Sequence, residues 1–123
     1  MPQIINLQEH KDPRGVLYVV EKLLPFTINR FYFIRDVPSD IVRGGHKHKK
    51  TWQAAICVSG SCTFTVLVDG VDIDYVLNNP SICLIIRPED WHEMKNFSSD
   101  AVLLVMASEF YDKNDYIDSK FEG

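Results

Sequence analysis

The stretch GGHKHKKTWQ, residues 44–53, contains two histidines two positions apart, His46 and His48. Successive side chains of a β-strand point to opposite faces, so residues i and i+2 share a face. Two histidines on one strand face are typical of a metal site. The position where an anionic further ligand is expected holds the neutral Gln53 instead. The stretch therefore leaves two alternatives: the histidines bind a metal, or they transfer protons themselves.

The spacing pattern continues beyond this stretch. Gly60 follows Gln53 at a distance of seven positions, and the later segment PEDWHEMKN, residues 88–96, supplies a third histidine, His92. The arrangement resembles the paired motifs of the cupin superfamily: H-x-H, a Glu, a Gly at a set distance, then a Pro-containing turn and a third His. That resemblance implies a cavity lined by histidines, with His92 expected to arrive from a facing strand.

Two departures from the cupin pattern bear on metal binding. Gln53 replaces the Glu, and Asp90 occupies the Gly position of a turn that is one residue shorter. An amide removes the anion from a three-histidine site, and the cationic Arg43, Lys47 and Lys49 would further disfavour a divalent cation if they face the pocket. We therefore expect no metal and no other cofactor. Imidazole has an unperturbed pKa of ~6.5, so histidines without a metal are suited to proton transfer next to a carbonyl.

Runs rich in β-branched and aromatic residues recur along the whole chain and are separated by turn residues. Asp69-Gly70 predicts a two-residue type I′ hairpin, because both central residues of that turn take positive φ. A short helical turn is predicted within 108–121. The sequence thus favours one all-β domain, 1–123, built as a cupin-type double-stranded β-helix, a jelly-roll barrel. The predicted strands span 4–7, 15–23, 28–37, 51–58, 62–68, 71–77, 81–87 and 101–107.

Composition restricts the partners and the compartment. The 123 residues carry a net charge of −4, which disfavours nucleic acid as a partner. No apolar run approaches the ~20 residues of a membrane helix, and the first residues show no secretory signal, so no membrane partner is expected. Three cysteines without a CxxC motif suit reduced thiols in the cytoplasm. The lysines at 47, 49 and 50 either protect a solvated strand edge or contribute to a pocket for a phosphorylated small molecule.

Several motifs together resemble one family, the nucleotide-sugar 3,4-ketoisomerases that act on dTDP-4-keto-6-deoxyglucose. The resemblance runs nearly end to end. It implies an isomerase that moves a keto group through an enediol and supplies a 3-keto sugar to a downstream aminotransferase, leading to 3-amino-3,6-dideoxyhexoses of surface glycans. It also implies a metal-independent homodimer of cupin barrels. The motifs are DPRGVL (12–17), NRFYFI (29–34), RGGHKHK (43–49), WHEM (91–94) and ASEFYDKNDYI (107–117).

The resemblance also implies roles for residues of the central motifs. His46 resembles the principal member of the catalytic acid/base pair, and His48 resembles its partner. Arg43 would bind phosphate or stabilise the enediolate. Tyr32 would donate a hydrogen bond to the sugar, or it is an ordinary core or interface tyrosine.

Four further residues are candidates for substrate binding. Arg14 and His92 lie where the family varies with the C4 configuration of the product, and this combination resembles the galacto-forming branch. Gln53 is expected to hydrogen-bond a histidine and fix its tautomer, or to touch the sugar. Trp91 either stacks on the thymine or caps the core.

Two residues depart locally from the family pattern. Lys47 is expected to point out of the barrel, and Gly45 either widens the cavity mouth or bulges the strand. Three other functions remain open at this point. They are a nucleotide-sugar 3,5-epimerase, a metal-dependent cupin and a non-catalytic sugar-binding module.

Overall fold

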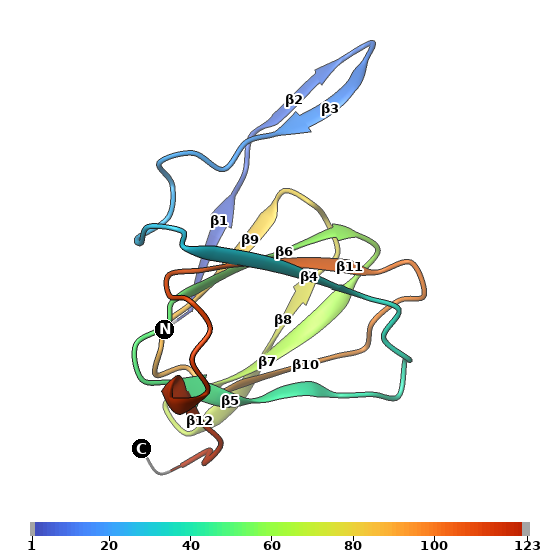
Figure 1. Ribbon diagram of the computed structural model, residues 1–123. Helices are drawn as coiled ribbons and strands as arrows, with labels where there is room; N and C mark the ends of the chain where they lie inside the picture. Colours follow the sequence, from blue (N-terminus) through green and yellow to red (C-terminus); the bar gives the residue numbers. More distant parts are fainter. Residues whose placement is uncertain (1, 122–123) are drawn as a thin grey trace.

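The computed structural model describes residues 2–121. Two five-stranded antiparallel sheets face each other across the core, and a separate two-stranded hairpin projects from them (Figure 1). The strand orders are β1-β9-β6-β11-β4 and β12-β5-β10-β7-β8. The elements are β1 (Gln3–Asn6), β2 (Glu9–Asp12), β3 (Gly15–Tyr18), β4 (Arg30–Arg35), β5 (Arg43–His48), β6 (Gln53–Ser59), β7 (Cys62–Val68), β8 (Val71–Leu77), β9 (Ile82–Ile86), β10 (His92–Lys95), β11 (Val102–Ala107), the 3₁₀ turn η1 (Lys113–Asp115) and β12 (Tyr116–Ile117).

The first sheet is buried on both faces along its central strands β6, β9 and β11. Its inner face packs on the second sheet through a core that includes Phe64, Leu84 and Leu103. Its outer face carries a second cluster, including Ile56 and Ile85, which the chain between β3 and β4 covers. Burial on both faces explains why β6, β9 and β11 are nearly continuous apolar runs rather than alternating ones.

The prediction of an all-β jelly roll is confirmed, and no α-helix occurs within residues 2–121. The strands predicted at 62–68 and 71–77 are found with those bounds, and the turn between them has positive φ at Asp69 and Gly70. The strand predicted at 15–23 ends at Tyr18, because the chain then leaves the hairpin to cover the outer cluster. The helical turn predicted within 108–121 is the 3₁₀ turn η1.

A β-bulge in β5 sets the orientation of the site residues. His92 pairs with His46 and Glu93 pairs with Gly44, so Gly45 is an extra residue without a partner on β10. Gly45 has φ +79 and Gly44 has φ +83, a conformation that side chains other than glycine rarely adopt. The prediction that Gly45 bulges the strand is confirmed.

The β2–β3 hairpin extends away from the barrel (Figure 1). It exposes Val16 and Leu17, whose exposed fractions are 46% and 61%. Phe31 and Phe33 on the outward face of β4 are 67% and 64% exposed. Apolar surface of this extent is unusual on an isolated domain. Among the described residues, none belongs to a helix with the length and apolar character that crossing a membrane requires.

Candidate active site

A cavity of about 250 Å³ opens between the two sheets. It collects polar side chains from β4, β5, β6, β10 and β12, elements that are far apart in the sequence. The polar side chains that line it are Arg30, Tyr32, Arg43, His46, Gln53, His92 and Tyr116. A larger hollow of about 580 Å³ lies along the β2–β3 hairpin and contains Arg14, but it is shallow and far more open.

The bulge at Gly45 explains why two cationic groups share this cavity. Arg43 and His46 are three positions apart, so in a regular strand they would point to opposite faces. One extra residue between them shifts the alternation by one position, and both side chains line the cavity.

The three predicted histidines form one cluster. The ring centroid of His46 lies 5.1 Å from that of His48 and 5.3 Å from that of His92. His46 and His92 are direct partners on neighbouring strands of the same sheet, so the prediction that His92 arrives from a facing strand is wrong. His48 does not line the cavity itself; its ring is buried behind the ring of His46.

The environments of the cavity histidines keep them neutral. The Nδ1–H of His92 donates to the carbonyl oxygen of Asp90 at 2.9 Å, which leaves Nε2 without a proton. Burial lowers the pKa of His92 to about 4. Burial and the neighbouring His48 likewise lower the pKa of His46. Both rings are therefore available as proton acceptors at neutral pH.

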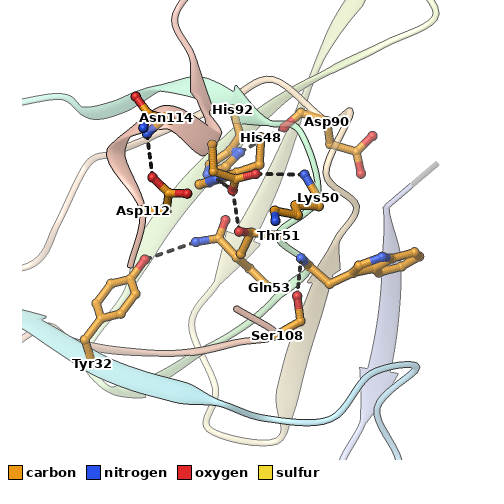
Figure 2. Close-up of polar contacts among 12 residues, drawn as sticks. Tyr32, His48, Lys50, Thr51, Gln53, Asp90, His92, Ser108, Asp112 and Asn114 are labelled. Carbon is orange, nitrogen blue, oxygen red and sulfur yellow. Dashed lines mark hydrogen bonds and ion pairs between the residues drawn. The ribbon is translucent and has the colours of Figure 1, made fainter. Parts of the chain in front are cut away.

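His48 has a different kind of partner. Its Nδ1 lies 2.9 Å from a carboxylate oxygen of Asp115, and both side chains are almost fully buried. Burial lowers the pKa of His48, and the carboxylate opposes that effect. Figure 2 shows this cluster with Thr51 and Lys50, which also contact Asp115.

Gln53 contacts a tyrosine rather than a histidine. Its amide Nε2 donates to the hydroxyl of Tyr32 at 3.1 Å (Figure 2). Its Oε1 is buried and has no hydrogen-bond partner within residues 2–121. The prediction that Gln53 fixes a histidine tautomer is wrong, whereas contact with the sugar remains a prediction. Burial raises the pKa of Tyr32, which keeps its hydroxyl protonated and able to donate.

Two other predicted residues lie outside the cavity. Trp91 is buried; its Nε1–H donates to the carbonyl oxygen of Asp118 at 3.3 Å, and the Lys120 ammonium lies 4.8 Å from the ring centroid. The ring is therefore held by residues 118–120, and stacking on the thymine stays a prediction. Arg14 lies on the projecting hairpin, where its exposed guanidinium pairs with Asp12.

Three site residues escaped the sequence analysis. Tyr116 lies with its ring centroid 4.7 Å from His46 and 4.6 Å from His48. Arg30 lies over the ring of Tyr32, with its Nε buried and unpartnered among the described residues. Arg30 could have been found, since it shares a strand face with Tyr32 at i+2. Asp115 and Tyr116 had no comparable signal, because their position depends on how the chain end packs on β5.

The three histidines and Gln53 are also the side chains that a metal ion at this site would need as ligands. Within residues 2–121, no three His, Cys, Asp or Glu side chains are arranged to hold one. The Nδ1 atoms of His48 and His92 face protein oxygens, and the fourth side chain of the cupin pattern is the amide of Gln53. Metal independence remains a prediction for experiment.

The chain matches the family model described as FdtA: WxcM-like, C-terminal over residues 1–122. It belongs to that family. Known members are similar over nearly the whole chain. The TDP-4-oxo-6-deoxy-alpha-D-glucose-3,4-oxoisomerase of Aneurinibacillus thermoaerophilus is 43% identical over 118 residues, which are 94% of this chain and 84% of that protein.

Solved structures similar to this chain also include those of sugar 3,4-ketoisomerases. QdtA, a sugar 3,4-ketoisomerase from Thermoanaerobacterium thermosaccharolyticum in complex with TDP, is 41% identical with a TM-score of 0.92, covering 96% of this chain and 88% of that one. WlaRB, a TDP-quinovose 3,4-ketoisomerase from Campylobacter jejuni, is 42% identical with a TM-score of 0.91, covering 96% and 92%. The predicted family, the cupin-type fold and the assignment as an isomerase of the sugar 3,4-ketoisomerase type are confirmed.

Proposed function

We propose that this FdtA-family member converts dTDP-4-keto-6-deoxyglucose into a dTDP-3-keto-6-deoxyhexose by histidine acid/base chemistry. The observation that carries this proposal is the cluster of His46, His48 and His92 at one cavity that also holds the Tyr32 hydroxyl. The relatives named above act on TDP-linked sugars by their names, which supports the same substrate class here.

The reaction needs only proton transfers. A base removes the C3 proton, the C3–H electron pair forms a C3=C4 double bond, and the C4 carbonyl oxygen takes up a proton to give an enediol. The O3 hydroxyl then loses its proton as the C3 carbonyl forms, and C4 takes up a proton. C3 is oxidised while C4 is reduced, so no external oxidant or reductant enters the balance. Positioned acid/base groups contribute ~10²–10⁴-fold to such a reaction.

We assign the proton transfers at carbon to His46, because it lines the cavity and burial keeps it neutral. His48, behind it, is the partner that exchanges protons with it. Tyr32 donates to a sugar oxygen, and the unpartnered Oε1 of Gln53 accepts from a sugar hydroxyl.

The cavity volume and charge support an arrangement of the substrate. About 250 Å³ suits a sugar ring better than a whole nucleotide sugar, since pockets for drug-sized ligands span roughly 300–1,000 Å³. Arg30 and Arg43 line the same cavity and supply the cationic groups that a diphosphate needs. The nucleotide then lies outside the cavity mouth.

We propose that the enzyme works as a homodimer. The exposed Phe31 and Phe33 on the outward face of β4, and the apolar hairpin, supply a surface for a second copy of the chain. Arg14 is on that hairpin, so it reaches a substrate only if the hairpin approaches the cavity of the other protomer. With the partner's Arg14 beside His92, the galacto configuration at C4 is the product that we expect.

The proposal also covers the compartment of the enzyme, its partners and the reaction that follows it. We propose a cytoplasmic domain, 1–123, that uses no metal or cofactor and no nucleic-acid or membrane partner; the free thiols of Cys57, Cys62 and Cys83 support that compartment. Its 3-keto product has the carbonyl that an aminotransferase needs in the next step.

The deciding experiment is proton NMR in D₂O of chelator-treated enzyme with dTDP-4-keto-6-deoxyglucose. Deuterium at C3 of recovered substrate or at C4 of a new 3-keto product supports metal-free ketoisomerisation, and the H4–H5 coupling of product formed in H₂O gives its configuration at C4. Exchange at C3 and C5 without carbonyl migration would identify a 3,5-epimerase. Turnover that returns only with added metal would contradict metal independence, and tight dTDP-sugar binding without turnover would identify a binding module.

A further inference from the structure

The segment that follows the last barrel strand packs against the histidine strand. Residues 112–117, here called the 112–117 segment, comprise the 3₁₀ turn η1 and the short strand β12. β12 pairs with β5 so that Tyr116 lies opposite His48. The backbone N–H of Lys49 also donates to the carbonyl oxygen of Asp115 at 2.9 Å. The segment is therefore held in register with the strand that carries His46 and His48.

The carboxylate of Asp115 is surrounded by donors. It accepts from the Nδ1–H of His48 at 2.9 Å, from the backbone N–H of Lys50 at 2.9 Å and from the hydroxyl of Thr51. Its residue is 4% exposed. Burial alone would raise the pKa of Asp115, but the hydrogen bonds from Thr51, Lys50 and His48 outweigh it and lower that pKa. Asp115 is thus a fixed anion at the back of the histidine cluster.

A fixed anion determines the tautomer of its partner. Because a carboxylate can only accept, Nδ1 of His48 carries the proton and Nε2 carries the lone pair. That Nε2 is buried and has no hydrogen-bond partner within residues 2–121. It is the one ring position of His48 that can take up a further proton.

Apart from Asp115, none of the groups described around His48 stabilises its ring when it takes up a proton. His46 lies on the same strand, His92 on β10, Tyr116 on β12, and Arg30 on β4 acts on His48 as a nearby positive charge. A cation at Arg30 disfavours protonation of His48, whereas the Asp115 carboxylate favours it. His92 donates to a neutral carbonyl instead, which offers a proton no comparable stabilisation.

We propose that Asp115 is a positioning residue for the isomerisation: it fixes His48 as the Nδ1–H tautomer and stabilises the ring when Nε2 takes up a proton. The proposal rests on the proposed function, in which His46 and His48 exchange protons. Asp115 does not touch the sugar in this scheme and acts only through His48.

The activity test compares Asp115→Asn with Asp112→Asn. Both variants remove one negative charge from the same segment, but Asp112 is exposed and caps η1 by accepting from the N–H of Asn114, a role that Asn also fills. We expect kcat of Asp115→Asn to fall about 100-fold with KM within about threefold, and the limb of the pH–rate profile that reports His48 to move to lower pH. Asp112→Asn should keep the wild-type kcat and profile.

The second measurement does not depend on turnover. Nitrogen-15 NMR of the histidine rings in the wild-type protein should show His48 with a protonated Nδ1 and an unprotonated Nε2, a pattern altered in Asp115→Asn. A protonated Nε2 in the resting wild-type enzyme would overturn the proposal, as would a wild-type rate and pH profile in a folded Asp115→Asn. If Asp115→Asn does not fold, the wild-type spectrum decides. Wild-type protein without ketoisomerase activity would refute the proposed function and leave the tautomer assignment standing.

Discussion

His46 differs from its two neighbouring histidines in what surrounds it. His48 is held by a carboxylate and His92 by a carbonyl, and both rings are almost completely buried. His46 is partly exposed and lines the cavity, with the rings of Tyr116, His48 and His92 around it. His46 is therefore the imidazole that can transfer a proton between a substrate carbon and the two buried histidines.

Replacement of His46 by Asn tests this position. We expect His46→Asn to reduce turnover of dTDP-4-keto-6-deoxyglucose by at least about 10³-fold, because burial lowers the pKa of the other cavity imidazole, His92, to about 4 and makes it a weak base. Binding of dTDP, measured by calorimetry, should change by less than about threefold, since we propose that the nucleotide binds outside the cavity. Asp112→Asn is the control, because Asp112 is exposed and does not line the cavity. An active His46→Asn enzyme would show that another group removes the proton.

The sequence predicted the three histidines and Gln53 because local spacing on strands determines which way their side chains point. It did not predict Asp115, which lies 67 positions from its partner His48. That contact depends on the register of β12 on β5, and nothing local to either segment determines that register.

At the level of elements, one turn of the barrel packs closely against a neighbouring loop. Gly60, between β6 and β7, has φ +66, and a Cβ there would lie 2.9 Å from Cα of Ala101 and closer still to the side chains of Ser98 and Asp100. This turn thus packs directly on the loop before β11. The cupin spacing that singled out Gly60 has a steric reason in this chain.

Gly60→Ala tests that close packing. We expect a loss of about 2–4 kcal/mol in the free energy of unfolding, from left-handed strain together with the clash. Gly70→Ala is the matched control, because Gly70 has φ +80 but nothing within 4 Å of its Cβ position. Gly70→Ala should lower the free energy of unfolding by only about 1–2 kcal/mol, from the left-handed strain alone. Chemical denaturation measures both, and equal losses would mean that the packing against Ala101 contributes nothing.

Strands were predicted well where the local sequence pattern determines them, and poorly where pairing with distant strands determines them. β7 and β8 were predicted with their bounds because alternation and the Asp69-Gly70 turn agree. A strand was expected at His92, but the bounds of β10 and its sheet were not predicted, because its four residues are mostly polar and its strand structure comes from pairing with β5 and β7 on either side. Tertiary pairing determines such a strand more than propensity does.

At the scale of the whole molecule, large apolar side chains are exposed on β4 and on the hairpin. β4 is an edge strand of its sheet, with outward phenylalanines and an unpaired ladder side. Exposed hydrophobic edges favour pairing with another chain. This surface could not be foreseen from the sequence, because alternation in NRFYFI does not say whether the outward face meets solvent or protein.

The double variant Phe31→Glu/Phe33→Glu tests whether this surface holds two copies together. We expect a monomer in analytical ultracentrifugation where the wild-type protein sediments as a dimer, because two carboxylates per protomer would have to be buried in the interface. Activity should fall with the dimer if the partner's Arg14 is needed. Val76→Glu is the control, since Val76 is 55% exposed on β8 of the other sheet and should leave the dimer intact. A wild-type protein that sediments as a monomer would contradict the proposed homodimer.

The position of the 112–117 segment has a consequence for proteolysis. Asp115 and Tyr116 form the wall behind His46 and His48, yet the strands from β1 to β11 all precede them in the chain. Residues 110–114, just before this wall, are exposed. A single cut there would therefore separate both histidines from their covalently attached wall while every strand from β1 to β11 stays covalently continuous.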